Sequence, residues 1–385
     1  IDIFHKEDRY RQFVPISRIA SQFPYAIDCK SNKKITIWCS NDYLGMGQLQ
    51  SARLAAVAAI NDSGLGSGGT RNISGTSKEV VALENLLATN YSRKSALTFV
   101  SGYIANDATI QSLAKIIPDL IIFSDQNNHA SIISGIKNSK LEKEIFAHND
   151  MTDLEHKLMR YPADKPKLII FESVYSMDGD FGEVESIVKL AKKYNAMTFC
   201  DEVHAVGIYG ERGGGYCQEI GLDHEIDIIQ GTFAKAYGVI GGFIVGTKNI
   251  VDAVRLNSSG FIFSTALPPM IAAAAFQTVN YLANSSQERE TLKLKVMKLK
   301  ELMSQRNIKI VDNNSHIISI KIGDARKAQL ASKKLLDQYD IYIQHINYPT
   351  VAKGDERLRV IVTPLHSNEM MFDLVSALTT ILAEL

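Results

Sequence analysis

The sequence has no excess of charge of either sign, no long apolar run and few cysteines. Its 385 residues include 42 basic and 42 acidic side chains, so no net charge attracts nucleic acid, an anionic membrane or a polycationic partner. No apolar run approaches the roughly 20 residues of a membrane-spanning helix, and the N-terminal segment lacks the apolar core of a secretory signal. We therefore expect a cytoplasmic protein that binds neither nucleic acid nor membrane.

Several motifs are also missing. The four cysteines are isolated and form no C-x-x-C pair, so the sequence predicts neither a metal site nor a disulfide framework. Neither the phosphate-loop motif G-x-x-x-x-G-K-[ST] nor a repeat of 20–50 residues occurs. With 45% apolar and 22% charged residues, the composition is that of a globular protein, and the chain is long enough to be an enzyme.

Short apolar runs alternate with helix-length stretches in the middle of the chain. Runs that are apolar throughout and spaced by helices predict an α/β domain with a parallel sheet covered on both faces. The pair of strands flanking Lys235 is joined by so few residues that we expect it to be antiparallel. The predicted strands are 96–100, 120–124, 168–172, 197–200, 226–230 and 241–245.

The pattern of apolar and polar residues changes after Pro268 and Pro269. Beyond them the sequence predicts long helices and a few short strands. Helices packed on a small, mostly antiparallel sheet are typical of a second domain. We predict an N-terminal arm at 1–44, a large catalytic domain at 45–277 and a small C-terminal domain at 278–385.

A glycine-rich stretch, GLGSGGTRN, occupies residues 64–72. Its spacing fits the dinucleotide pattern G-x-G-x-x-G, but it follows a helical stretch at 52–61 where the dinucleotide fold requires a strand. We interpret it as a loop that can approach a ligand closely; a plain surface loop is the alternative. Thr76 and Glu79 then predict a capping box that starts the next helix.

Two polar residues follow apolar strands. Asp201 is at the carboxyl end of a strand, where ligands of α/β proteins bind; it could keep a ring nitrogen protonated or merely cap a turn. Lys235 lies among small neutral residues. Most lysines are surface charges, but burial lowers the pKa of a lysine and lets it form a Schiff base with a carbonyl. Thr232, nearby, could offer its hydroxyl to a phosphate.

Other features suit an anionic ligand. A strand runs through Gly102 into a helix, which aims unpaired amides at the crevice. His129 starts another helix and either caps it or lies on an aromatic cofactor. Arg357 and Arg359 share one face of a strand; a guanidinium grips carboxylates, although most arginines are at the surface. Together these features are typical of a pyridoxal phosphate site.

The chain resembles the α-oxoamine synthase family over essentially its whole length. The resemblance is carried by the segments GSGGTRNISGT (66–76), SDQNNHASIISGIKNS (124–139), IFAHND (145–150), ESVYSMDGD (172–180), DEVHAVGIYGERGGG (201–215), GTFAKAYG (231–238), GFIFSTALPP (260–269) and INYPTV (346–351). It implies a fold-type I pyridoxal phosphate transferase with a mostly parallel seven-stranded sheet and a smaller α+β domain. Ala234 and His345 depart from the family pattern, which usually has glycine and proline there.

The resemblance also implies the role of each site residue. Lys235 would form the Schiff base and transfer a proton, Asp201 would pair with the ring nitrogen, and His129 would stack on the ring. The other cofactor ligands it implies are Ser176 and His204 at the phenolic oxygen, Gly102, Tyr103 and Thr232 at the phosphate, and Ser264 and Thr265 from the neighbouring subunit of a homodimer with shared active sites. The implied substrate ligands are Arg359 and Asn41 for a glycine carboxylate, and Arg11, Thr70, Asn72 and Ile73 for a succinyl group.

The reaction that the resemblance implies joins glycine to succinyl-CoA with release of CoA and carbon dioxide. RNISGT and YIQHINYPTV are the segments most similar to the enzyme with these two substrates. Two alternatives stay open: a relative that uses another acyl-CoA or amino acid, as glycine C-acetyltransferase and 8-amino-7-oxononanoate synthase do, and an inactive protein of the same fold. An inactive protein of this fold is expected to lack Lys235 or Asp201, and both are present.

Overall fold

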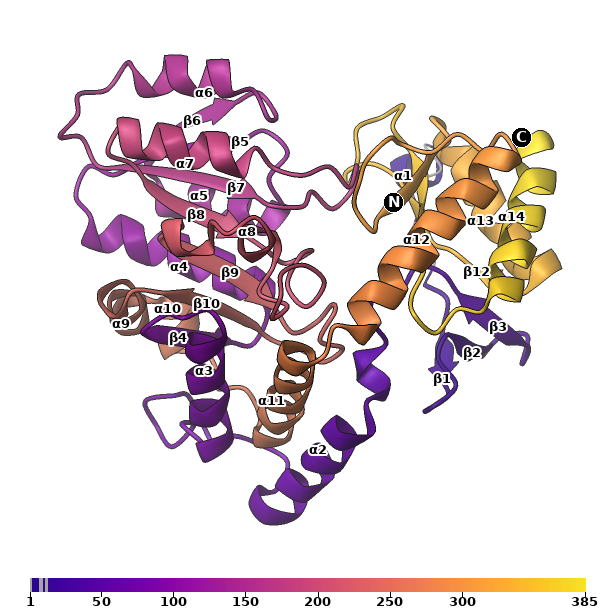
Figure 1. The fold of residues 1–385 in the computed structure, drawn as a ribbon, viewed down its shortest axis with the longest axis horizontal. Helices are drawn as coiled ribbons and strands as arrows, with labels where there is room; N and C mark the ends of the chain where they lie inside the picture. The colour runs from indigo at the N-terminus through magenta and orange to yellow at the C-terminus, as the bar shows by residue number, and fades with distance from the viewer. Residues whose placement is uncertain (1, 7–9, 11–12) are drawn as a thin grey trace. The chain divides into compact units, whose positions relative to one another are not determined.

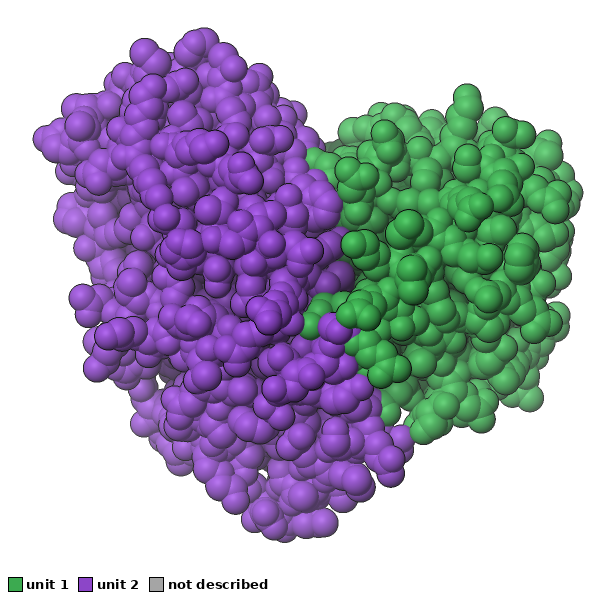
Figure 2. Space-filling view, viewed as in Figure 1, with its two compact units in different colours: residues 1–48, 176–180, 287–385 green, residues 49–175, 181–286 purple. Residues whose placement is uncertain are grey.

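The computed structural model describes residues 2–6, 10 and 13–385. The chain divides into two compact units, which Figure 2 shows in different colours. Unit 1 comprises residues 1–48, 176–180 and 287–385, and unit 2 comprises residues 49–175 and 181–286. Among the described residues, no helix is both long enough and apolar enough to cross a membrane.

Unit 2 is built on a seven-stranded sheet with the order β4-β10-β9-β8-β7-β5-β6 (Figure 1). Its strands are β4 (Ser95–Phe99), β5 (Ile121–Asp125), β6 (Glu142–Phe146), β7 (Lys167–Glu172), β8 (Met197–Asp201), β9 (Ile228–Thr232) and β10 (Gly242–Gly246). β10 is antiparallel to β4 and β9, whereas the other neighbours are parallel. The mostly parallel sheet and the antiparallel pair around Lys235 are confirmed.

The buried strands of the sheet are predictable from the sequence, whereas the exposed edge strand is not. Every residue of β5, β7 and β9 is buried, which is why the stretches 121–123, 168–171 and 228–229 within them are apolar throughout. β6 is an edge strand whose first residues, Glu142, Lys143 and Glu144, are exposed or half-buried. Charged side chains on an edge prevent pairing with other chains, and here they also hide the strand from a search for apolar runs.

Helices cover the sheet of unit 2. They are α2 (Gln50–Ser63), α3 (Lys78–Asn90), α4 (Gly102–Ile116), α5 (Ala130–Ser139), α6 (Met151–Leu158), α7 (Val184–Lys193), α8 (Tyr216–Glu219), α9 (Lys248–Asn257), α10 (Ser259–Ile262) and α11 (Pro269–Asn284), with a 3-10 turn η2 (Asp223–Glu225). α4 packs against β4, β9 and β10, and α7 packs against β8 (Figure 1). Leu97, Ile122, Leu168, Phe199 and Ile244 belong to a core cluster that also contains buried residues of α4, α5, α9 and α10.

The start of α3 corrects one prediction. The predicted capping box begins at Thr76, but the residue that caps the helix is Ser77, whose hydroxyl accepts a hydrogen bond from the Val80 amide at 3.3 Å. Thr76 is used differently, because its hydroxyl donates to the backbone oxygen of Arg71 at 2.6 Å. The predicted capping box was therefore wrong, and Thr76 belongs to the loop before the helix.

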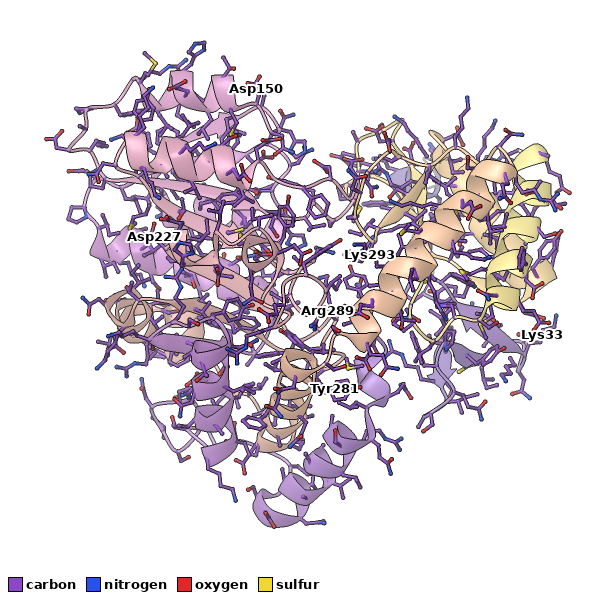
Figure 3. All side chains as sticks on the ribbon, in the orientation of Figure 1. Lys33, Asp150, Asp227, Tyr281, Arg289 and Lys293 are labelled. Atoms are coloured by element: carbon purple, nitrogen blue, oxygen red, sulfur yellow. The ribbon has the colours of Figure 1, made fainter. Side chains whose placement is uncertain are left out.

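A side-chain clamp fixes β8 next to β9. Asp227, labelled in Figure 3, accepts hydrogen bonds from the Thr198 amide at 2.8 Å and from the Thr198 hydroxyl at 3.1 Å. The backbone amide of Asp227 donates in turn to the same hydroxyl at 3.0 Å. This reciprocal contact sets the position of a strand whose last residue is Asp201.

Unit 1 contains two small sheets, with the orders β1-β2-β3-β12 and β11-β14-β13. Its elements are α1 (Asp2–Lys6), β1 (Ile16–Arg18), β2 (Tyr25–Asp28), β3 (Lys34–Ile37), η1 (Met46–Gln48), α12 (Gln287–Gln305), β11 (Ile318–Lys321), α13 (Ala325–Tyr339), β12 (Ile341–Tyr342), β13 (His345–Ile346), β14 (Arg357–Val360) and α14 (Asn368–Ala383). The segment 176–180 is held in this unit by Arg357, whose guanidinium donates to the Asp178 carboxylate at 2.6 Å.

Candidate active site

Asp201 lies at the carboxyl end of β8 and is 3% exposed. One carboxylate oxygen accepts a hydrogen bond from the Asn106 side-chain amide at 2.7 Å, and the other accepts from the Val203 backbone amide at 2.8 Å. Burial raises the pKa of this carboxyl, while these hydrogen bonds and the charges of His129 and Lys235 lower it. The result is a fixed carboxylate in an apolar surrounding, which gains most when a cation pairs with it.

A chain of hydrogen bonds links Asp201 to His129. The Asn106 amide donates to the Ser131 hydroxyl at 3.0 Å as well as to Asp201. Nδ1 of His129 accepts from the Ser131 backbone amide at 3.2 Å and lies 2.7 Å from the Ser131 hydroxyl. Because Nδ1 is an acceptor, these bonds place the proton of the neutral imidazole on Nε2. His129 both caps α5 and takes part in this network, so the two interpretations of the sequence are compatible.

Glu172 holds the backbone of His129 through a hydrogen bond. Its carboxylate accepts from the His129 amide at 2.6 Å, and its Cα is paired with that of Asp201 across β7 and β8. Burial raises the pKa of the Glu172 carboxyl well above its usual range, and the charge of Asp201 raises it further. Burial lowers the pKa of the His129 imidazole, which keeps that ring neutral.

Sequence reasoning assigned no role to Asn106 or Glu172. Both are buried, at 1% and 2% exposure. Asn106 is a buried polar residue of α4, and a buried amide requires a partner. That requirement was the available sign, but it does not name the partner, which comes from another strand.

Lys235 lies three residues beyond the end of β9 and is half-buried. Its charge acts on Asp201, His129 and Glu172, so the structure places these four residues in one electrostatic environment. Thr232, at the end of β9, donates its hydroxyl to the Gly241 oxygen at 2.8 Å and accepts from the Ala234 amide at 3.1 Å.

The start of α4 lies against Thr232. Ser101 caps the helix by accepting from the Ile104 amide at 3.2 Å, and the amides at the first helical positions, Gly102 and Tyr103, have no acceptor within the helix. A Cβ atom at Gly102 would lie 3.2 Å from the Thr232 Cβ and 3.3 Å from its hydroxyl oxygen. Glycine therefore lets the amide end of α4 and the Thr232 hydroxyl approach each other.

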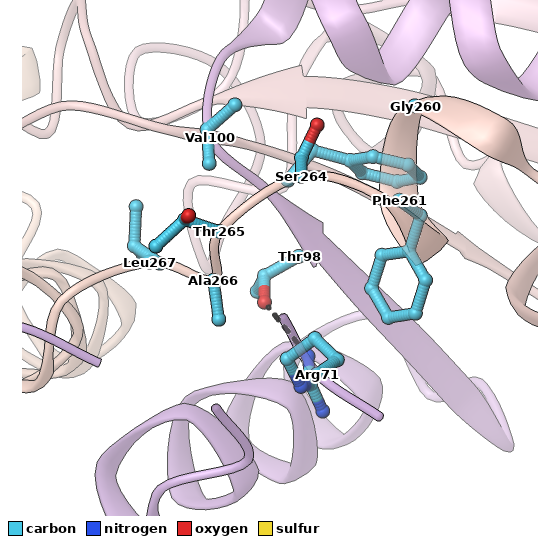
Figure 4. Close-up of a pocket in the computed structure, with 10 residues that line it drawn as sticks. Arg71, Thr98, Val100, Gly260, Phe261, Ser264, Thr265, Ala266 and Leu267 are labelled. Atoms are coloured by element: carbon cyan, nitrogen blue, oxygen red, sulfur yellow. Dashed lines mark hydrogen bonds between the residues drawn. The ribbon is translucent and has the colours of Figure 1, made fainter. Parts of the chain in front are cut away.

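The predicted acyl-binding residues Thr70, Asn72 and Ile73 lie in the loop before α3, where Asn72 and Ile73 are exposed. Thr70 forms an isolated β-bridge with Thr265. Ser264 and Thr265 line a small pocket together with Arg71, Thr98, Val100 and Phe261 (Figure 4). The loop predicted to bind the acyl group therefore lies next to Ser264 and Thr265, which are predicted to contact the cofactor of the neighbouring subunit.

Arg359 of β14 forms a separate polar cluster in unit 1. Its guanidinium donates to the Tyr43 hydroxyl at 2.5 Å and to the Asn41 side-chain oxygen at 3.4 Å. The rings of Tyr43 and His316 meet edge to face with centroids 4.6 Å apart. Burial lowers the pKa of His316 to about 3, and the charge of Arg359 contributes. The structure therefore places Asn41 beside Arg359, whereas the contact of both residues with a glycine carboxylate stays a prediction.

The remaining predicted residues are placed as follows. His204 is buried in unit 2, three residues after Asp201. Ser176 is half-buried and belongs to the 176–180 segment of unit 1. Arg11 lies outside the described residues, so the cation predicted for the succinyl carboxylate has no structural description.

Comparisons with known proteins show the family to which the chain belongs. The family model for aminotransferases of class I and II matches residues 33–378. The chain is 50% identical to a 5-aminolevulinate synthase of Rickettsia bellii, over the whole chain and 92% of that protein. It is 47% identical to a 5-aminolevulinate synthase of Bradyrhizobium diazoefficiens, over 98% of the chain and 93% of that protein.

Solved structures show the same fold. A structure of SPT with its PLP internal aldimine aligns with a TM-score of 0.91 and 28% identity, covering 96% of this chain and 92% of that one. These findings confirm the family resemblance and the fold-type I architecture predicted from the motifs. The chain is an enzyme of the class I and II aminotransferase family and, within it, a member of the 5-aminolevulinate synthase family.

Proposed function

We propose that this enzyme condenses glycine with succinyl-CoA to give 5-aminolevulinate, CoA and carbon dioxide, with pyridoxal phosphate as its cofactor. It is then an acyltransferase, and its product is the first dedicated precursor of haem and other tetrapyrroles. The observation that carries the proposal is the hydrogen-bond network that joins the buried Asp201, Asn106 and Ser131 to His129, with the charge of Lys235 acting on Asp201 and His129. The identity of up to 50% to 5-aminolevulinate synthases supports the choice of substrates.

The residues present fit pyridoxal phosphate. A fixed buried carboxylate, Asp201, suits the protonated ring nitrogen, and a neutral imidazole, His129, can lie on the ring without adding charge. The amides of Gly102 and Tyr103 and the Thr232 hydroxyl would hold the phosphate, because the first amides of a helix bind anions. Ser176 and His204 would bind the phenolic oxygen, and Ser264 and Thr265 of a second copy would complete the phosphate site.

When bound, the cofactor supplies a conjugated ring that accepts the electron pair left by the glycine α-proton. Asp201 holds a proton at the ring nitrogen, and Asn106 and Val203 keep its carboxylate in place for that task. Lys235 would hold the cofactor through its Nζ and would afterwards move the α-proton at the same atom. A lysine next to buried carboxylates and a neutral imidazole can both hold and release that proton.

Substrate selection comes from charge and space. Arg359 would grip the glycine carboxylate, with Asn41 and Tyr43 orienting its guanidinium. A difference of one methylene is worth only about 1–3 kcal/mol, so selection of a succinyl group over a neutral acyl group needs a cation at its distal carboxylate. We assign that role to Arg11, and assign contacts with the acyl chain to Thr70, Asn72 and Ile73.

Three further predictions stay proposals. The enzyme works as a homodimer with shared active sites, in the cytoplasm, without nucleic acid or membrane as a partner. Its domains are an arm at 1–44, a catalytic domain at 45–277 and a C-terminal domain at 278–385. The exposed Thr265, proposed for the neighbour's phosphate, is the feature that fits a shared site.

A panel of acyl-CoAs tests the function. The purified holoenzyme is supplied with glycine and succinyl-, acetyl- or pimeloyl-CoA, and CoA release is measured together with the amino-ketone product. We expect succinyl-CoA to give the highest kcat/KM. A higher value with acetyl-CoA would assign the chain to glycine C-acetyltransferase chemistry, and one with pimeloyl-CoA to 8-amino-7-oxononanoate synthesis.

A further inference from the structure

Arg71 lies in the sequence between Thr70 and Asn72, which are proposed to contact the acyl group. Its own side chain instead contacts Glu84 of α3 in unit 2. Its two terminal nitrogens donate to the two carboxylate oxygens of Glu84 on α3, at 2.6 and 3.0 Å. The Arg71 and Glu84 side chains are only 11% and 13% exposed. Such a two-point contact fixes direction as well as distance, so it orients the loop relative to the helix.

Glu84 is itself held by β4. Glu84 Oε1, which accepts from Arg71 Nη1, also accepts from the Thr98 backbone amide at 2.9 Å and from the Thr98 hydroxyl at 3.0 Å. The guanidinium of Arg71 lies 5.4 Å from the centre of the Phe261 ring, a position suited to cation–π attraction. Arg71 is thereby connected to a strand of the large sheet, to α3 and to α10.

Hydrogen bonds tie the loop around Arg71 to Arg71 itself. The Thr70 backbone oxygen accepts from the amides of Ile73 and Gly75, both at 2.9 Å. Thr76 donates to the Arg71 oxygen at 2.6 Å and accepts from Arg71 Nε at 3.2 Å. A Cβ at Gly75 would lie 2.4 Å from the Gly69 oxygen, so the turn closes only with glycine there.

The same loop contacts the segment proposed for the phosphate of the neighbouring subunit. Thr70 and Thr265 form a β-bridge, and the Ala266 amide donates to the Gly69 oxygen at 2.9 Å. Figure 4 shows Arg71 beneath this segment with its hydrogen bond to Thr98. The orientation that Arg71 imposes therefore applies to Thr70, Asn72 and Ile73 together.

We propose that Arg71 is a specificity-determining positioning residue, which acts through Glu84 to hold Thr70, Asn72 and Ile73 in the arrangement that selects a short dicarboxylic acyl thioester. This inference rests on the proposed function. Both terminal nitrogens of Arg71 are engaged by Glu84, so Arg71 is not itself the cation for the distal carboxylate. Lysine has one nitrogen in place of the fork, and charge alone does not restore the geometry.

The test uses the holoenzyme and the ratio of kcat/KM for succinyl-CoA to that for acetyl-CoA at saturating glycine. We expect Arg71→Met and Arg71→Lys both to lower this ratio by on the order of tenfold to a hundredfold, since a displacement of about 1 Å has effects of that size. The glycine KM should stay within about twofold. Arg160→Met, which removes an exposed arginine paired with Glu144 at 3.2 Å, is the matched control and should change neither quantity.

A double-mutant cycle adds a second measurement. Glu84→Gln keeps an acceptor for Thr98 but weakens the fork, and we expect the combination of Arg71→Met with Glu84→Gln to lower the ratio no further than Arg71→Met alone. An unchanged ratio in Arg71→Met would overturn the proposal. So would a full rescue by Arg71→Lys, or an equal rise of the glycine and succinyl-CoA KM values. A wild-type enzyme that does not prefer succinyl-CoA would overturn the proposed function instead, independently of the variants.

Discussion

The buried carboxyls around Asp201 in unit 2 and the buried imidazoles of unit 1 respond to burial in opposite directions. In unit 2, burial raises the pKa of three carboxyls, those of Asp201, Glu172 and Glu202. In unit 1, burial lowers the pKa of two imidazoles, His316 and His366, to about 3. Burial therefore favours the protonated, neutral form of these carboxyls and the unprotonated, neutral form of these imidazoles.

The difference corresponds to the two proposed tasks. A protonated ring nitrogen and Lys235 supply positive charge to the carboxyls of unit 2, where the proton transfers take place. In unit 1 the neutral His316 leaves the Arg359 guanidinium as the positive group of its cluster, ready for a carboxylate. We expect substitutions of Asp201 and Lys235 to affect the chemical step and those around Arg359 to affect glycine binding.

Replacing Lys235 should have the largest effect. Lys235→Ala removes both the covalent anchor and the group that moves the α-proton, and we expect kcat to fall by about 10³-fold or more. Borohydride treatment of the wild type should fix the cofactor onto the peptide that contains Lys235, as seen by mass spectrometry. Lys143→Ala, on the edge strand β6, is the control and should retain activity. Fixation onto another lysine would refute the assignment.

Asp201→Asn should rank second. The amide keeps the shape but cannot stabilise a proton on the ring nitrogen, so we expect kcat to fall by about 10²–10³-fold, the usual cost of losing one electrostatic contact to the reacting centre. The glycine KM should change little, and the absorbance of the bound cofactor should shift. Asp252→Asn, on the surface of α9, should be neutral. A variant that loses glycine affinity but keeps kcat would contradict the division between the units.

Acid should weaken unit 1 before unit 2. An unfolded imidazole takes a proton near pH 6.5, but His316 and His366 do so only near 3, so between these values the unfolded state binds more protons. At pH 4.5 each histidine then costs about 3 kcal/mol of stability. Asp42 offsets part of this loss of stability, because burial raises the pKa of its carboxyl to about 6. The folded state therefore binds a proton at Asp42 more readily than the unfolded state does. The raised carboxyls of unit 2 act in the opposite sense and favour the folded state as the pH falls.

Hydrogen exchange can measure this contrast. After correction for the intrinsic rate, peptides of β11 and β14 should lose protection between pH 6.5 and 4.5, while peptides of β8 should keep theirs. His224→Asn, at an exposed position, should leave the contrast unchanged. Earlier loss of protection in β8 would show that the buried groups do not set the acid stability of the two units.

Arg359→Lys should have the smallest effect. The lysine retains the charge but loses the fork that holds Tyr43 and Asn41, and we expect the glycine KM to rise about tenfold, equivalent to about 1.4 kcal/mol. kcat should stay within a few fold, in contrast to Asp201→Asn. Arg306→Lys, exposed at the end of α12, serves as the control. An equal loss of kcat would place Arg359 in the chemical step.

The sequence was most informative where local patterns and burial agree. Asp201 and Lys235 were identifiable because Asp201 ends one largely buried strand of the sheet and Lys235 follows another, at the edge where ligands of this fold class bind. β6 was missed because its charged residues suit an edge and not a core. Glu84 was missed because its partner Arg71 lies 13 residues away across a turn, and the hydrophobic pattern of α3 carries no information about that pairing.

Labelled glycine tests the central claim most directly. The holoenzyme is given succinyl-CoA and glycine carrying ¹³C either at the carboxyl carbon or at the α-carbon, and the products are followed by NMR. The account predicts label in carbon dioxide from the first substrate and label in 5-aminolevulinate, beside its amino group, from the second. Release of CoA without labelled carbon dioxide, or carbon dioxide without a labelled amino-ketone, would contradict decarboxylative condensation at this site.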